Sequence, residues 1–216
     1  GWGDTSPYRN YRAMAQSIDV MLGHSTLRGY PDMDQSEVTT SVAEDPALGV
    51  QAAFAIVAAL HYRNRTGKGQ ILDLCLAEGF MPYMPQAFMD YAMNGRVQGT
   101  LGNRDTVAAP CGVYQCIGQD KWVSIMVNND AEWQGFCKAV DEEWAKDERF
   151  GDLLSRQRHQ DELDKLVGTW TSRHEDYEVM YLLQKHGIAA GPVLDEAAVY
   201  ADPQLNARGF WVEETQ

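Results

Sequence analysis

The pattern of apolar and polar residues along the chain predicts a mixed α and β protein with one strongly apolar helix. Residues 47–60 are almost wholly apolar, with AFAIVAAL at their centre, which predicts a helix buried on nearly all sides. Asp45 and Pro46 stand at its start, where Asp is a preferred N-cap and Pro a preferred first residue. The run Thr66-Gly67-Lys68-Gly69 predicts its end, because a glycine commonly follows the last helical residue.

Weaker patterns predict the remaining elements and divide the chain into two parts. Apolar residues recur at helical spacing in residues 11–23, 78–93, 131–140, 156–170, 177–186 and 195–200. Extended patterns occupy residues 70–76, 112–116, 121–127, 188–194 and 209–216, the second and third forming a hairpin around Gly118-Gln119-Asp120. Apolar core segments lie before about Asp130 and amphipathic polar helices after it. The expected fold class is α/β in the broad sense, a mixed α+β chain with a first part at residues 1–95 and a second, α+β part at residues 96–216.

Composition and charge narrow the class of protein. The 216 residues are 44% hydrophobic and 23% charged, which is typical of a globular protein. Eighteen Lys and Arg against 31 Asp and Glu give a net charge of −13, which argues against nucleic-acid binding because phosphate neutralisation needs a basic face. No apolar run approaches the ~18 residues of a membrane-spanning helix, and no charged-then-apolar leader is present. With four cysteines, too few for a disulfide framework, we expect a reduced cytoplasmic protein without membrane or nucleic-acid partners.

Asp45 is the residue with the clearest chemical interpretation. Esterase and nucleotide-phosphate motifs are missing from the sequence, and no spacing of His, Cys or carboxylates predicts a metal site. His24 follows Gly23 in a loop, and nothing near it in the sequence gives it a role. At a helix start, unpaired N–H groups and the positive end of the helix dipole can keep the Asp45 carboxylate ionised and nucleophilic. The same position suits a simple N-cap, so local sequence leaves both roles open.

Several longer stretches occur together and in order along nearly all of the chain. They are Gly1-Trp2-Gly3-Asp4-Thr5-Ser6-Pro7-Tyr8-Arg9-Asn10-Tyr11, Asp45-Pro46-Ala47-Leu48-Gly49, Arg63-Asn64-Arg65-Thr66-Gly67-Lys68-Gly69-Gln70, Gly112-Val113-Tyr114, Gly191-Pro192-Val193 and Asp202-Pro203-Gln204. This series resembles the class III CoA-transferases, the group of formyl-CoA transferase and carnitine CoA-transferase. The Asp45 stretch is similar to the family's Asp-x-x-x-Gly helix. Because the family's enzymes are roughly twice as long, the resemblance implies a fragment without the N-terminal half and the C-terminal segment.

The resemblance implies an activity and a set of site residues. CoA would move from an acyl-CoA donor to a carboxylic-acid acceptor through an aspartyl-CoA thioester on Asp45, with no metal. Arg9, Asn10, Tyr11 and Arg12 would contribute contacts to coenzyme A. Residues 1–95 would be the central part of the large CoA-binding and catalytic domain, and residues 96–216 the smaller domain with the start of the return to the large one. The full-length protein would be an interlocked homodimer.

Two other functions stay open at this stage. An α-methylacyl-CoA racemase-like enzyme needs a His/Asp pair, and the expected position of its histidine falls near Tyr11, where there is no imidazole. Tyrosine is a poor base at neutral pH, which disfavours this alternative. The other alternative is an inactive fragment or interaction module. We expect the isolated chain to have negligible transferase activity, because the resemblance places most of the CoA pocket outside it.

Overall fold

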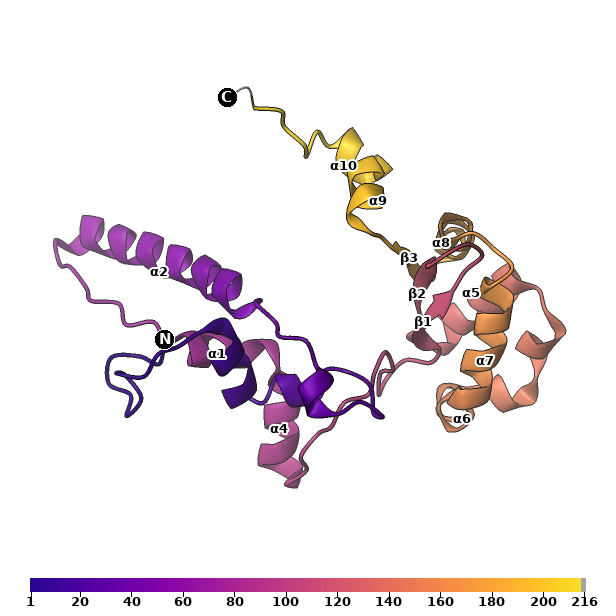
Figure 1. Cartoon of the computed structure of the whole chain (residues 1–216), viewed down its shortest axis with the longest axis horizontal. Helices are drawn as coiled ribbons and strands as arrows, with labels where there is room; N and C mark the ends of the chain where they lie inside the picture. The colour runs from indigo at the N-terminus through magenta and orange to yellow at the C-terminus, as the bar shows by residue number, and fades with distance from the viewer. Residues whose placement is uncertain (215–216) are drawn as a thin grey trace. The chain divides into compact units, whose positions relative to one another are not determined.

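The computed structural model describes residues 1–214. These residues form two compact units, and the boundary between them along the chain falls between Gly102 and Asn103. The first unit is helical, and the second combines helices with a small sheet (Figure 1). The predicted class, mixed α+β, is confirmed. Residues 96–102 belong to the first unit, where the Thr100 hydroxyl donates a hydrogen bond to the Gly29 carbonyl. The equivalence of these units with the parts of a larger transferase stays a prediction.

The first unit contains four helices and three short 3₁₀ turns among its described residues. They are α1 (Ala15–Met21), η1 (Ser25–Leu27), η2 (Gln35–Glu37), α2 (Glu44–Thr66), α3 (Leu76–Phe80), η3 (Met81–Tyr83) and α4 (Pro85–Asn94). Its small core consists of Trp2, Ile18, Leu22, Ala77, Phe80 and Met84. The predicted helix at 11–23 is shorter than expected, because α1 spans only Ala15–Met21. The predicted helix at 78–93 is interrupted, because Pro82 and Pro85 lack the N–H groups a continuous helix would need.

Helix α2 ends where the sequence predicted, but it is not buried as predicted. Gly67 follows Thr66 with a φ of +74°, a left-handed conformation that glycine adopts without strain. The expectation of burial on nearly all sides is wrong for the described chain, since Phe54 is 77% exposed and Val50 71%. An apolar helix needs other elements around it, and residues 1–214 cover only part of its surface.

Contacts with α3 hold α2 in place. The Gln51 side-chain amide donates a hydrogen bond of 2.7 Å to the Gly79 carbonyl. A Cβ atom on Gly79 would stand 2.6 Å from Cδ1 of Leu48, so the two helices approach closely here and a larger residue would require the Leu48 side chain to shift. Residues 70–75, predicted as a strand, have no regular structure. The next residue, Leu76, instead donates a 2.9 Å hydrogen bond from its N–H to the Gly1 carbonyl, which joins this part of the chain to the N-terminal segment.

Asp90 on α4 closes the loop that follows this helix. Its carboxylate accepts hydrogen bonds from Asn94 at 2.8 Å, Arg96 at 2.7 Å and Gln98 at 3.1 Å. These donors lower the pKa of Asp90 from its ordinary 3.8 to about 2, and the Arg96 guanidinium has the largest effect.

We expect Asp90→Asn to destabilise the protein in a pH-dependent manner. The folded-state pKa of Asp90 lies below its ordinary value, so the ionised carboxylate stabilises the fold fully above about pH 5. The advantage of the wild type then shrinks as the pH falls through the interval between 3.8 and about 2. Urea unfolding of both proteins between pH 3 and pH 7 measures this difference. An equal gap in unfolding free energy at both ends of the range would contradict the assignment.

The second unit is built on a three-stranded antiparallel sheet. Strand β1 (Cys111–Gln115) pairs with β2 (Trp122–Met126), which also pairs with β3 (Ala189–Val193). The predicted hairpin and the extended segment at 188–194 are thereby confirmed. The described helices of this unit are α5 (Asp130–Val140), α6 (Leu153–Arg158), α7 (Gln160–Thr171), α8 (Asp176–Lys185), α9 (Glu196–Ala201) and α10 (Pro203–Ala207), with 3₁₀ turns η4 (Glu143–Lys146) and η5 (Glu148–Phe150).

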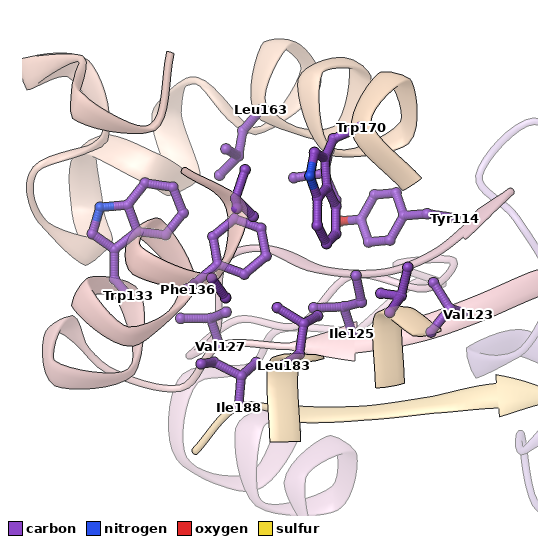
Figure 2. Packing of buried hydrophobic residues seen from close by; sticks show 14 of the residues in the cluster. Tyr114, Val123, Ile125, Val127, Trp133, Phe136, Leu163, Trp170, Leu183 and Ile188 are labelled. Carbon is purple, nitrogen blue, oxygen red and sulfur yellow. The ribbon is translucent and has the colours of Figure 1, made fainter. Parts of the chain in front are cut away.

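The core of the second unit combines aromatic rings with aliphatic side chains. Figure 2 shows the rings of Trp133, Phe136 and Trp170 side by side, with centroid separations of 5.3 Å and 6.3 Å for successive pairs. The predicted helix at 156–170 is split at His159 into α6 and α7. The strand predicted at 209–216 is absent over residues 209–214, and residues 215–216 lie outside the described chain. None of the helices formed by residues 1–214 combines the length and apolarity needed to cross a bilayer.

Candidate active site

Asp45 lies in the first turn of α2 with its carboxylate open to solvent. The helix begins at Glu44 with Ala43 as the N-cap, so Asp45 is its second residue and not the cap that the sequence allowed. Within residues 1–214 no donor hydrogen-bonds to the Asp45 side chain, and no cation pairs with it. The carboxylate is therefore available for chemistry, at the positive end of a 23-residue helix that favours a negative charge.

The backbone around Asp45 offers one accessible donor for a developing oxyanion. The N–H groups of Glu44 and Asp45 have no carbonyl partner within their own helix, as is general for a first turn. Pro46 has no N–H, and the Ala47 N–H already donates to the Ala43 carbonyl at 3.1 Å. Glu44 is completely buried, so the N–H of the exposed Asp45 is the group of this turn suited to stabilise an oxyanion in acyl transfer.

Glu44, the neighbour of Asp45, points the opposite way, into the protein. Its side chain is completely buried, and its Oε1 atom lies 3.4 Å from Nδ1 of His24. The same nitrogen is 2.7 Å from Oδ1 of Asp19, which is also buried. Sequence reasoning missed Asp19 and Glu44 and found no role for His24. Their spacing of 5 and 20 residues along the chain carries no recognisable signal, because packing alone brings them together.

The four residues expected to contact coenzyme A, which are Arg9, Asn10, Tyr11 and Arg12, lie in the turns before α1 and are all exposed. The Tyr11 ring stacks on Tyr8 with centroids 5.1 Å apart. In the part of the chain that the structure describes, no carboxylate pairs with Arg9 or Arg12, so both guanidinium groups are free for an anion. No hydrogen bond or ion pair joins these residues to Asp45 in that part.

The cysteines are poorer nucleophile candidates than Asp45. Burial raises the pKa of Cys116 and of Cys137 to about 11. Burial, with Asp105 and Asp164 nearby, also raises the pKa of Cys111. A raised pKa keeps these three thiols protonated and unreactive at neutral pH.

Comparisons with known proteins identify the family. CoA-transferase family III matches the chain over residues 1–216. The chain belongs to this family. Among characterised relatives, the succinyl-CoA–D-citramalate CoA-transferase of Chloroflexus aurantiacus is 29% identical over 96% of the chain and 52% of that protein. The acetyl-CoA:oxalate CoA-transferase of Acetobacter aceti is also 29% identical, over 99% of the chain and 54% of that protein.

A solved structure extends the similarity to the fold. The CAIB/BAIF family protein from Brucella suis superimposes with a TM-score of 0.81 at 30% identity, covering 97% of this chain and 55% of that one. The chain thus spans about half the length of the family III relatives that it matches. Membership of family III confirms the recognition made from the motifs, while the roles of Asp45 and of residues 9–12 stay predictions.

Proposed function

We propose that this chain supplies the nucleophile of a CoA-transferase that moves CoA from an acyl-CoA donor to a carboxylic acid. The observation that carries the proposal is the solvent-open, unpartnered carboxylate of Asp45, in an Asp-x-x-x-Gly sequence at the start of α2. Family III membership over residues 1–216 supports the same chemistry.

The first half-reaction transfers CoA onto the protein. An oxygen of the Asp45 carboxylate attacks the thioester carbonyl of the donor, the C–S bond breaks, and a mixed anhydride and CoA thiolate form. The N–H group of Asp45 is suited to stabilise the oxyanion of this step. The thiolate then attacks the aspartyl carbonyl carbon, which releases the donor acid as a carboxylate and leaves an aspartyl-CoA thioester.

The second half-reaction runs the same steps in reverse with a different acid. The acceptor carboxylate attacks the aspartyl-CoA thioester, which gives a new mixed anhydride and free CoA thiolate. The thiolate attacks the acyl carbon of the acceptor, so the new acyl-CoA leaves and the Asp45 carboxylate is regenerated. Thioester energy is conserved only if water is kept from both acyl intermediates, which requires a closed site during turnover.

The free guanidinium groups of Arg9 and Arg12 support a role in holding the anionic cofactor. Coenzyme A carries phosphates, and arginine binds phosphate through paired hydrogen bonds. A chain with a net charge of −13 needs such local cations, and screening over about 8 Å at physiological salt lets them act locally. Asn10 and Tyr11 complete the proposed contact segment.

The substrates proposed here are small acids. Characterised relatives are named for succinyl-CoA, for acetyl-CoA with oxalate, and for succinate with glutarate. Succinyl-CoA and acetyl-CoA are therefore the donors with which to begin. The homodimer and the cytoplasmic location implied by the resemblance remain proposals.

Trapping the covalent intermediate tests the proposed function. The full-length protein, meaning the natural polypeptide that contains these residues, is incubated with succinyl-CoA or acetyl-CoA and quenched with hydroxylamine. We expect a hydroxamate on the peptide that contains Asp45, and its loss in Asp45→Ala. Arg12→Ala should still form the hydroxamate but need a higher donor concentration, since it lacks only a binding contact.

The other two functions give different results in the same experiment. Exchange of the α-proton of a 2-methylacyl-CoA in deuterated water, without a hydroxamate, would indicate a racemase and refute the proposal. Neither exchange nor hydroxamate, from a folded protein, would indicate the inactive alternative.

A further inference from the structure

A chain of ionisable side chains, two of them fully buried, lies beneath the start of α2. It consists of Arg28, Asp19, His24 and Glu44, which come from α1, the turns that follow it, and the first residue of α2. Asp19 is 1% exposed and Glu44 is not exposed at all, whereas His24 and Arg28 are partly buried. Two carboxylates are costly to bury unless they are compensated, so their arrangement needs a reason.

Asp19 accepts from both basic side chains of the cluster, while Arg28 also donates through Nη1 to the Thr39 carbonyl and its Nε has no partner in the described residues. Arg28 donates to Oδ2 of Asp19, and His24 Nδ1 lies 2.7 Å from the other oxygen, Oδ1. Glu44 Oε1 lies 3.4 Å from that same nitrogen, which has a single N–H to give. Neither oxygen of Glu44 has a hydrogen-bond partner in the described residues. Glu44 therefore lies against the imidazole without a hydrogen bond of its own.

The first turn of α2 has no side-chain cap, and the buried side chain of Glu44 anchors it instead. Ala43, the N-cap of α2, has no side chain that can accept a bond from the first turn. An uncapped first turn frays easily, yet this turn bears the proposed nucleophile. Because successive residues point about 100° apart around a helix, inward anchoring of Glu44 sets the direction of Asp45, which is exposed.

We propose that Glu44 is a positioning residue for Asp45, acting through its buried contact with the Asp19–His24 pair. This inference rests on the proposed function. Glu44 does not touch the reacting atoms; it fixes the rotation of the first turn, so that the Asp45 carboxylate and the Asp45 N–H meet the thioester in one geometry. Displacement of a reacting group by about 1 Å costs on the order of 100-fold in rate, which makes such anchoring effective.

A metal centre is the competing explanation for the same cluster. Ligand atoms of Asp19, His24 and Glu44 all lie within 4.8 Å of one another. Two ligands on a tetrahedral zinc, each about 2.0 Å from the ion, stand roughly 3.3 Å apart. The 2.7 Å between His24 Nδ1 and Asp19 Oδ1 is a hydrogen-bond distance instead, and Arg28 already supplies a cation.

The test measures acylation of Asp45 in a single turnover of the full-length protein with succinyl-CoA or acetyl-CoA. Glu44→Gln keeps the shape of the side chain and removes its charge. We expect acylation to slow about 10- to 100-fold while the KM for the donor stays within about twofold. Because removing one partner of a buried pair can destabilise a protein, the melting temperature is measured as well, and both rates are compared at a temperature where both proteins are fully folded. Glu196→Gln, an exposed glutamate on α9, should behave as wild type.

A second variant and a double variant separate positioning from general damage. His24→Asn keeps an N–H near the position of Nδ1 but removes the imidazole against which Glu44 lies, so it should slow acylation similarly. The double variant should be no more than about threefold slower than the slower single variant, because both changes break one contact. If Glu44→Gln does not fold, His24→Asn alone decides.

Three results would overturn the inference. The first is acylation of Asp45 at the wild-type rate in Glu44→Gln. The second is a double variant whose acylation is slowed by the product of the two single-variant factors. The third is stoichiometric retention of added Zn²⁺ by the wild type that is lost in Glu44→Gln. Failure of the proposed function is recognisable separately, since the wild type itself would then form no Asp45 adduct, and the positioning role would fall with it.

Discussion

Replacement of Asp45 by Asn should reduce CoA transfer by the full-length protein by at least about 1,000-fold, because an amide cannot form the mixed anhydride and all later steps depend on it. The donor KM should change little, since Asp45 has no binding role in the proposed site. The fold should be preserved: the side chain is exposed and has no partner among residues 1–214, so the unfolding free energy should change by no more than about 0.5 kcal/mol. Steady-state transfer assays and thermal unfolding measure the two quantities.

Asp32→Asn is the matched control for this prediction. Asp32 is an exposed aspartate of the same unit, outside any helix, and its variant should retain wild-type activity. Turnover by Asp45→Asn within tenfold of wild type would show that another group is the nucleophile, and the proposed mechanism would then be wrong.

Replacement of Arg156 by Met should have the largest effect on stability. This arginine of α6 is completely buried and donates to the Ala109 carbonyl at 2.8 Å, the Phe150 carbonyl at 3.1 Å and the Asp130 carboxylate at 2.8 Å. Its guanidinium also lies over the Trp133 ring at 4.9 Å. Methionine fills much of the space but leaves two carbonyls without this donor, so we expect a loss of about 3–5 kcal/mol in the free energy of unfolding.

Chemical denaturation of the 216-residue chain measures this loss. Arg158→Met provides the control, because Arg158 lies on the same helix but is exposed, and its change should stay within about 0.5 kcal/mol. An Arg156→Met protein as stable as the Arg158→Met protein would show that the buried hydrogen bonds contribute little.

Local sequence predicted most elements because their signals act over short distances. A glycine after Thr66 ends α2, and the alternating segments on either side of Gly118-Gln119-Asp120 pair as β1 and β2. Predictions failed where an element depends on distant partners. Residues 70–76 alternate like a strand, but an isolated strand needs a neighbour for its backbone groups, and none pairs with it in the described chain. The apolar composition of α2 likewise predicted a burial that residues 1–214 do not provide.

The sequence by itself was enough to recognise the family and to point to Asp45, because an ordered series of short motifs can be read without knowledge of the fold. Only the tertiary structure decided that Asp45 lies in the first turn as an open carboxylate and not as its cap. It alone brought Asp19, His24 and Glu44 into contact. The physical reason is that a helix start is defined by a local turn of backbone, whereas the partners of a buried charge are set by the packing of segments far apart in the chain.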